Sequence, residues 1–105
     1  MTTEKRKLMT IYLDYNDTEG ELPLYEAIVR RLVHLEVAGA TVLTGIMGFG
    51  RGGRVHRKRL FGVTDDKPVI IRVVDREEKI MAALEQIRPM VTEGLIVLQD
   101  IEIVL

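Results

Sequence analysis

Residues 68–87 read PVIIRVVDREEKIMAALEQI, in which a strand pattern leads directly into a helix pattern. The first part, 68–74, is rich in β-branched residues and predicts a strand. Asp75 and Glu78 then have the D-x-x-E spacing of a capping box, which predicts a helix start. The helix would bury one apolar stripe, formed by Ile80, Ala83, Leu84 and Ile87. Pro89 predicts its end, because proline is poorly tolerated inside a helix.

The same order of strand and helix occurs earlier in the chain. Residues 8–13 place Met9, Ile11 and Leu13 on one face at a period of two and predict a strand. Pro23 suits the first turn of a helix, and we expect Gly39 to end that helix. The apolar stripe of this helix would be Tyr25, Ile28, Val29, Leu32 and Leu35.

Two further strands, at 41–47 and 95–105, complete the order βαββαβ. With right-handed crossovers this order predicts a ferredoxin-like α+β sandwich, a four-stranded antiparallel sheet with two helices on one face. The length of 105 residues fits a single domain, so we expect one domain spanning residues 1–105.

Two helices can cover only one face of such a sheet. The strand at 68–74 is nevertheless apolar on both faces except for Arg72, and Leu43 and Met47 lie opposite Val42 and Ile46 in the strand before it. An exposed apolar face favours association, so we expect copies of the chain to cover part of it. The alternative is a monomer with scattered surface aliphatic residues.

The composition excludes several classes of protein. The chain has no cysteine, which rules out disulfides and thiolate chemistry and fits a cytoplasmic location. Its apolar runs are too short for a membrane helix, and we identify no signal peptide. The sequence pI of about 6.1 argues against a general nucleic-acid binder, so no nucleic-acid partner is expected.

One short segment carries a strong positive charge. Residues 51–59 read RGGRVHRKR and sum to +5, so the other residues sum to −6 because the whole chain carries −1. This segment opens a loop at 51–66 that has no helix or strand periodicity, and loops of that length are usually functional or disordered. We interpret it as an arm that contacts anions, with a solvated hairpin end as the alternative.

The motifs around this loop resemble those of the PII signal-transduction proteins, which carry G-F-G-R at the base of a long mobile loop. Here the motif is Gly48-Phe49-Gly50-Arg51. More closely, GIMGFG at 45–50, His56 and IRVVDREEKI at 71–80 look like those of an uncharacterised family of bacterial and archaeal PII relatives. That resemblance covers residues 7 to 105.

The resemblance implies a homotrimeric regulatory protein with an adenine nucleotide (ATP, ADP or AMP) bound between subunits. The loop would change shape to control a partner protein, with a membrane-associated partner among the options. Residues carried over to ligand binding are Gly48, Gly50 and Arg51 at the loop base. The loop side chains assigned to ligand and partner contact are Arg54, His56, Arg57, Lys58 and Arg59.

Departures from the PII pattern leave a smaller anion open as the ligand. The glycine- and lysine-rich phosphate loop of PII proteins is replaced here by residues 90–94, MVTEG. Gly52 stands where PII has a glutamine, which argues against 2-oxoglutarate and magnesium binding. No tyrosine lies within 51–66, so modification of a loop tyrosine is not available.

Three other functions are alternatives to a regulatory role: RNA binding, catalysis and metal binding. An RNA-binding domain shares the βαββαβ order, but the strand at 68–74 has no stacking aromatic residue. A small ferredoxin-like enzyme would need a nucleophile or an acid–base pair, and His34 and His56 are the only histidines. A metal site of the kind suggested by the trimeric divalent-cation-tolerance proteins lacks ligands for the same reason. We therefore expect a non-enzymatic protein without a metal.

Overall fold

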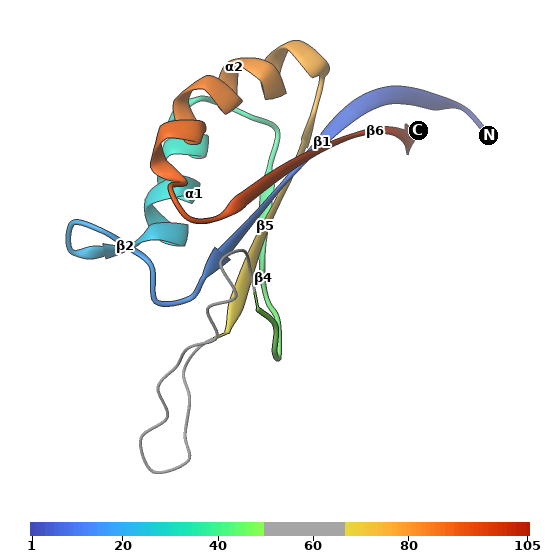
Figure 1. Ribbon diagram of the computed structural model, residues 1–105. Coiled ribbons are helices and arrows are strands. Elements are labelled where there is room, and N and C mark those ends of the chain that lie inside the picture. The colour runs from blue at the N-terminus through green and yellow to red at the C-terminus, as the bar shows by residue number, and fades with distance from the viewer. Residues whose placement is uncertain (50–66) are drawn as a thin grey trace.

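A computed structural model describes residues 1–49 and 67–105 of the chain. Its main sheet has four antiparallel strands in the order β4-β5-β1-β6. The strands are β1 (Thr3–Asp14), β4 (Ala40–Thr44), β5 (Pro68–Asp75) and β6 (Leu95–Val104). Two helices, α1 (Leu24–His34) and α2 (Glu77–Ile87), cover one face of the sheet (Figure 1). The predicted ferredoxin-like α+β fold is confirmed.

The core lies between the helices and one face of the sheet. Alternation along β1 and β5 directs every second side chain toward the helices. The fully buried aliphatic side chains are Met9, Ile11, Ile28, Leu32, Val69, Ile71, Val73, Ile80 and Ile87. Each contributes roughly 1.5–3 kcal/mol by leaving water, so this layer holds the sheet and helices together. Of the two apolar stripes expected from helical spacing, Ile28, Leu32, Ile80 and Ile87 are among these residues, and Ala83 is also buried. The other stripe residues, Tyr25, Val29, Leu35 and Leu84, are partly buried and pack against this core.

Helix α1 ends earlier than expected, and the assignment of its end to Gly39 is wrong. Glu36 has a φ of 62°, and its N–H donates to the Val33 carbonyl oxygen at 3.0 Å. The N–H of Val37 donates to the Leu32 carbonyl oxygen at 3.4 Å. These two bonds form a Schellman motif, with Glu36 in the left-handed position that glycine usually takes. Val37 packs against the core, which turns the chain back toward the sheet.

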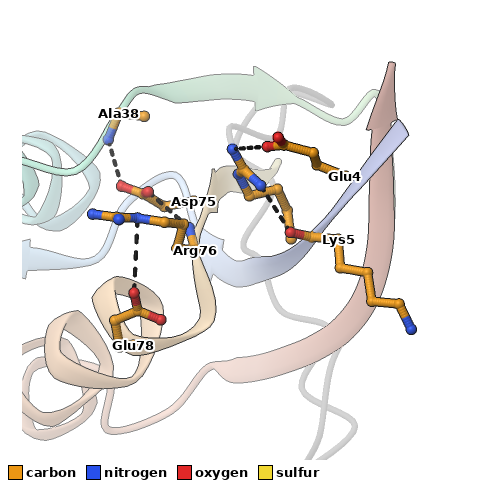
Figure 2. Close-up of polar contacts among 7 residues, drawn as sticks. Glu4, Lys5, Ala38, Asp75, Arg76 and Glu78 are labelled. Carbon is orange, nitrogen blue, oxygen red and sulfur yellow. Dashed lines mark hydrogen bonds and ion pairs between the residues drawn. The ribbon is translucent and has the colours of Figure 1, made fainter. Parts of the chain in front are cut away.

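The capping box expected at Asp75 and Glu78 does not form. Asp75 is the last residue of β5, and Arg76 occupies the N-cap of α2 without a side-chain capping bond. The Asp75 carboxylate instead accepts from the Ala38 N–H at 2.8 Å and from the Arg76 N–H at 2.7 Å (Figure 2). It therefore ties the α1–β4 connection to the start of α2, while Glu78 lies 3.8 Å from Arg76 Nε.

Several element bounds differ from the predicted ones. Strand β1 begins at Thr3, before the expected residue 8, and β4 ends at Thr44, before the expected residue 47. A small hairpin, β2 (Thr18–Glu19) with β3 (Leu22–Pro23), precedes α1 and was not expected. Its tight turn uses Gly20, whose φ is 61°. The end of α2 agrees with the prediction, because Pro89 lies in the short 3-10 helix Arg88–Met90 that follows it.

The sheet face away from the helices carries many apolar side chains. We define the uncovered face as the side of the sheet toward which Leu8 and the residues that share its orientation point. Its apolar residues include Leu43, Ile70, Val74, Leu95, Val97 and Ile101. Leu43 and Leu95 are each 45% exposed. The predicted two-faced pattern is therefore present in β4 and β5, and β6 adds further apolar residues to the uncovered face. Ile46 and Met47, however, lie beyond the end of β4 and belong to neither face.

Candidate functional site

The long loop leaves the fold at the end of the sheet where β1 and β4 finish and β5 begins. The N–H of Gly45, just after β4, donates to the Pro68 carbonyl oxygen at 2.7 Å. The N–H of Tyr15, just after β1, donates to the Lys67 carbonyl oxygen at 2.8 Å. We call Tyr15, residues 45–49, Lys67 and Pro68 the loop base. We call residues 45–49 the first stem of the loop, and Lys67 with Pro68 its second stem. Each stem is thus hydrogen-bonded to the main fold.

Two glycines allow this close approach. A Cβ on Gly45 would lie 2.5 Å from Pro68 Cγ, closer than real carbon atoms approach. A Cβ on Gly48 would lie 3.3 Å from the same atom, which is tight but accessible to small shifts. Gly45 is therefore required for packing against Pro68, whereas Gly48 keeps its backbone close to the proline ring.

A pair of tyrosines braces the loop base from the side of α1. Tyr15 and Tyr25 stack with ring centroids 5.7 Å apart and an angle of 22° between the ring planes. A hydrogen bond with Tyr15 and the partial burial of the ring raise the pKa of Tyr25. Because Tyr15 also donates to Lys67, this pair links the first turn of α1 to the second stem of the loop.

The first stem exposes apolar side chains to solvent. Ile46 is 94% exposed, and Met47 and Phe49 are each 81% exposed. Three such residues in four positions form an apolar patch at the mouth of the loop base. A patch of this kind suits contact with a planar ring or with another polypeptide chain.

Of the site residues expected from the sequence, the structure describes one, Gly48. It lies in the first stem, next to Pro68 as described above. The others are Gly50, Arg51, Arg54, His56, Arg57, Lys58 and Arg59, and they lie outside the described residues. The expected loop at 51–66 lies outside them as well, so its role stays a prediction.

A second feature, an open groove of about 680 Å³, lies at the opposite end of the sheet, between the start of α2 and the strands β1 and β6. Its lining is almost entirely charged and consists of Lys5, Arg6, Arg76, Glu77, Glu78, Asp100, Ile101 and Glu102. This groove could not be predicted from the sequence, because its charges come from three separate stretches of the chain.

Ion pairs neutralise much of the charge in and around the groove. Lys7 Nζ lies 2.8 Å from Asp100 and 3.9 Å from Glu77, and its side chain is only 16% exposed. The hydrogen bond between Lys7 and Asp100 lowers the pKa of Asp100 and raises the pKa of Lys7 from their ordinary values. Figure 2 shows Glu4 and Lys5 on β1 to one side and Arg76 and Glu78 to the other. The groove is thus a balanced surface with little net attraction for anions.

The turn between α2 and β6 is packed against the sheet. Met90 and Val91 lie against the core, and a Cβ on Gly94 would collide with the Tyr12 carbonyl oxygen. The same Cβ would lie 2.9 Å from Val91 Cγ1. This turn therefore has little room to wrap around a phosphate group.

Residues 1–49 and 67–105 contain neither a metal-binding cluster nor a membrane-spanning helix. No group of three or more histidine, cysteine, aspartate or glutamate side chains in these ranges is placed to hold a metal ion. Within the same ranges, neither α1 nor α2 is long and apolar enough to cross a membrane. His34, on α1, is exposed, as expected from its position on the outer helix face.

Comparison with known proteins gives matches over nearly the whole chain. The model of the family DUF190, described as Uncharacterized ACR, matches residues 6–103. A UPF0166 protein of Aquifex aeolicus is 32% identical over 99% of this chain and 98% of its own length. A UPF0166 protein of Methanocaldococcus jannaschii is 39% identical over 91% of this chain and 89% of its own length.

Among solved structures, the chain is similar to CPII, a nitrogen regulatory PII-like protein from Thiomonas intermedia, bound to ADP, AMP and bicarbonate. The TM-score is 0.73 and the identity is 22%, over 97% of this chain and 91% of the CPII chain. At that identity the match establishes the shared fold.

Proposed function

Because the chain belongs to the DUF190 family and has the fold of a PII-like protein, we propose that it is a PII-like regulatory protein. It binds a small anionic ligand, an adenine nucleotide, between the subunits of a homotrimer. Ligand binding changes the population of conformations of the loop at 51–66, and the loop controls a partner protein. The protein acts in the cytoplasm and catalyses no reaction.

The observation that carries this proposal is the loop base. It joins the ends of β1, β4 and β5 and presents the exposed apolar side chains of Ile46, Met47 and Phe49. A purine ring needs an apolar contact surface of this kind, and the phosphates need cations next to it. The cations follow directly in the sequence, from Arg51 to Arg59. The nucleotide in CPII makes the adenine class the first to test.

The packed turn before β6 changes where phosphate charge is neutralised. Because a Cβ on Gly94 would collide with the Tyr12 carbonyl oxygen, the turn at residues 91–94 has little room for a phosphate group. The phosphates must then be neutralised by the segment 51–59, which begins with Arg51 directly after Gly48-Phe49-Gly50 in the sequence. We therefore expect nucleotide affinity to depend strongly on salt and on the loop arginines.

The homotrimer is supported by the uncovered face. No helix of the described chain covers it, yet Ile70, Val74, Val97 and Ile101 there are half-buried and Leu43 and Leu95 are exposed. Burying this face between copies removes apolar area from water. Clefts between the copies then lie beside the edge strands, and β4 leads directly into the loop base.

Isothermal titration with ATP, ADP, AMP and cyclic nucleotides, with and without magnesium, tests the proposal. We expect micromolar binding with about one site per chain, which corresponds to about −8 kcal/mol. The same samples are examined by light scattering, where three chains per particle are expected. Absence of heat with every nucleotide at two temperatures would contradict the nucleotide proposal and leave the basic loop as a docking surface for an acidic protein.

A triple variant separates the loop from the fold. Replacing Arg54, Arg57 and Arg59 with alanine is expected to weaken nucleotide affinity at least tenfold, because it removes three phosphate-directed cations. The melting temperature should change little. Arg30→Ala is the matched control, since Arg30 is an exposed arginine of α1 paired only with Glu26 in the described structure. Unfolding of the triple variant would make the loop a structural element and refute its assigned role.

A further inference from the structure

Three backbone edges of the main sheet lack a strand partner within the described chain: the outer side of β4, the outer side of β6, and one side of residues 3–6 in β1. Strand β4 pairs with β5 on one side, and its other side is an outer edge of the sheet. Strand β1 loses its β5 partner beyond Lys7, because β5 ends at Asp75 opposite that residue. Residues 3–6 therefore pair only with β6, and the two strands continue as a ribbon that projects from the sheet (Figure 1).

Strand β4 lacks the features that usually protect an edge from pairing, whereas residues 3–6, TEKR, are mostly charged. Strand β4 reads ATVLT, without charge or proline, and all five residues are exposed. Natural proteins guard such edges with charged side chains, proline or bulges. A two-stranded ribbon is itself marginally stable in water, so the projecting part of β1 and β6 gains most from a third strand. One chain thus carries an unprotected edge and a ribbon that lacks a neighbour.

The charges on the uncovered face are complementary between these two places. Arg72 lies on this face, is exposed, and pairs in register with Thr41 of β4. Within the described chain no ion pair or side-chain hydrogen bond involves the Arg72 guanidinium. Glu4 has the same orientation as Leu8 and therefore lies on the same face, in the ribbon. Its carboxylate contacts the neighbouring Arg6 at 2.9 Å.

We propose that residues 3–6 of one copy pair with β4 of the next copy, with Glu4 opposite Thr41. This register keeps the uncovered faces of both copies on one side and brings the Glu4 carboxylate next to Arg72 of the neighbour. Thr41 is small enough to leave room between the two long side chains. The contact joins two different edges, so it repeats head to tail and closes into a ring. It rests on the homotrimer proposed above and names the strands that build it.

A pair of cysteines tests the register, and the natural chain contributes no cysteine of its own. Directly opposite residues on paired strands have Cβ atoms about 5 Å apart, within the range that disulfide formation can close with small backbone shifts. The double variant Glu4→Cys with Thr41→Cys is expected to give a covalent three-chain species after mild oxidation. Each single variant is expected to stay a one-chain species on a denaturing gel.

Two results of this experiment overturn the pairing. One is a wild-type chain that is trimeric by light scattering while the double variant forms no covalent species beyond one chain. The other is a covalent dimer from Glu4→Cys alone, which would place two ribbons side by side. If the wild-type chain binds nucleotide in either case, the proposed function stands and only the strand pairing fails.

A charge exchange tests the same contact without cysteines. Glu4→Arg and Arg72→Glu are each expected to raise the concentration at which the oligomer dissociates about tenfold, because like charges then meet across the contact. The double variant restores the opposite charges and is expected to return to within about threefold of the wild-type value. Lack of recovery in the double variant, when each single variant dissociates and all three keep wild-type circular dichroism, overturns the pairing.

Discussion

Gly94 offers a direct test of the packed turn between α2 and β6. Replacing it with alanine places a Cβ against the Tyr12 carbonyl oxygen, 2.9 Å from Val91 Cγ1 and 3.2 Å from Leu13 Cδ2. The obstructing oxygen belongs to the backbone of β1. Tyr12 is paired with Ile70 on one side and with Leu95 on the other, so it cannot move without disturbing both ladders.

The expected cost follows from two opposing effects. Overpacking a well-packed site costs about 1–3 kcal/mol, and a backbone obstacle puts Gly94→Ala at the upper end. Alanine also restricts the unfolded chain, which returns about 0.4–1 kcal/mol. The net loss is about 2 kcal/mol, which corresponds to a melting temperature roughly 10 °C lower in a domain of this size.

Thermal and urea unfolding followed by circular dichroism measure this loss, at one fixed protein concentration because association shifts apparent stability. Gly39→Ala is the matched control, since a Cβ there meets nothing within 4 Å. The control is expected to keep or slightly raise the wild-type stability. If the Gly94→Ala variant melts within about 2 °C of the control, the turn has room for a side chain, and the argument that it cannot serve a phosphate loses its basis.

Three further outcomes follow from contacts of single residues. Glu36→Gly should stabilise the protein by about 1 kcal/mol in urea unfolding, because Glu36 occupies a left-handed position at a φ of 62°; a loss of stability would contradict this. Asp75→Ala should cost about 1–2 kcal/mol by the same assay, since two N–H groups, one from Ala38, lose their acceptor; an unchanged midpoint would show that water replaces the carboxylate. The lowered pKa of Asp100 stabilises the folded protein at pH values above 3.8, the ordinary pKa of the group. This stabilisation disappears as the pH falls through the pKa that Asp100 has in the folded protein, and Asp100→Asn should remove it. The wild-type and Asp100→Asn unfolding midpoints should therefore differ at pH 6 and converge toward pH 2; a difference that is the same at every pH would rule out the Lys7 ion pair as the cause.

The fold could be predicted because hydrophobic periodicity is local and strong. Alternation in β1 and the helical stripes of α1 and α2 determine which faces are buried, and the structure buries those faces. The end of α1 was predicted less well than the end of α2. Gly39 is an acceptable helix-ending residue by propensity, yet the helix ends at His34, because Val37 gains more by packing against the core.

The candidate site could also be predicted only in part from the sequence. The motif at Gly48-Phe49-Gly50-Arg51 indicates the loop and its family, and the charge of residues 51–59 indicates an anionic ligand. The contact between Gly45 and Pro68 could not be predicted, because it joins residues on opposite sides of the long loop. The charged groove was missed for the same reason.

The sequence by itself determined the order of elements, the buried faces, the family resemblance and the concentration of positive charge, since each depends on neighbours along the chain. The tertiary structure decided where β4 ends, what Asp75 binds, how the loop stems are attached and which strand edges lack a partner. These features depend on side chains and backbone groups that meet only after folding. Their energies come from contacts between distant segments, and local propensity carries no information about those contacts.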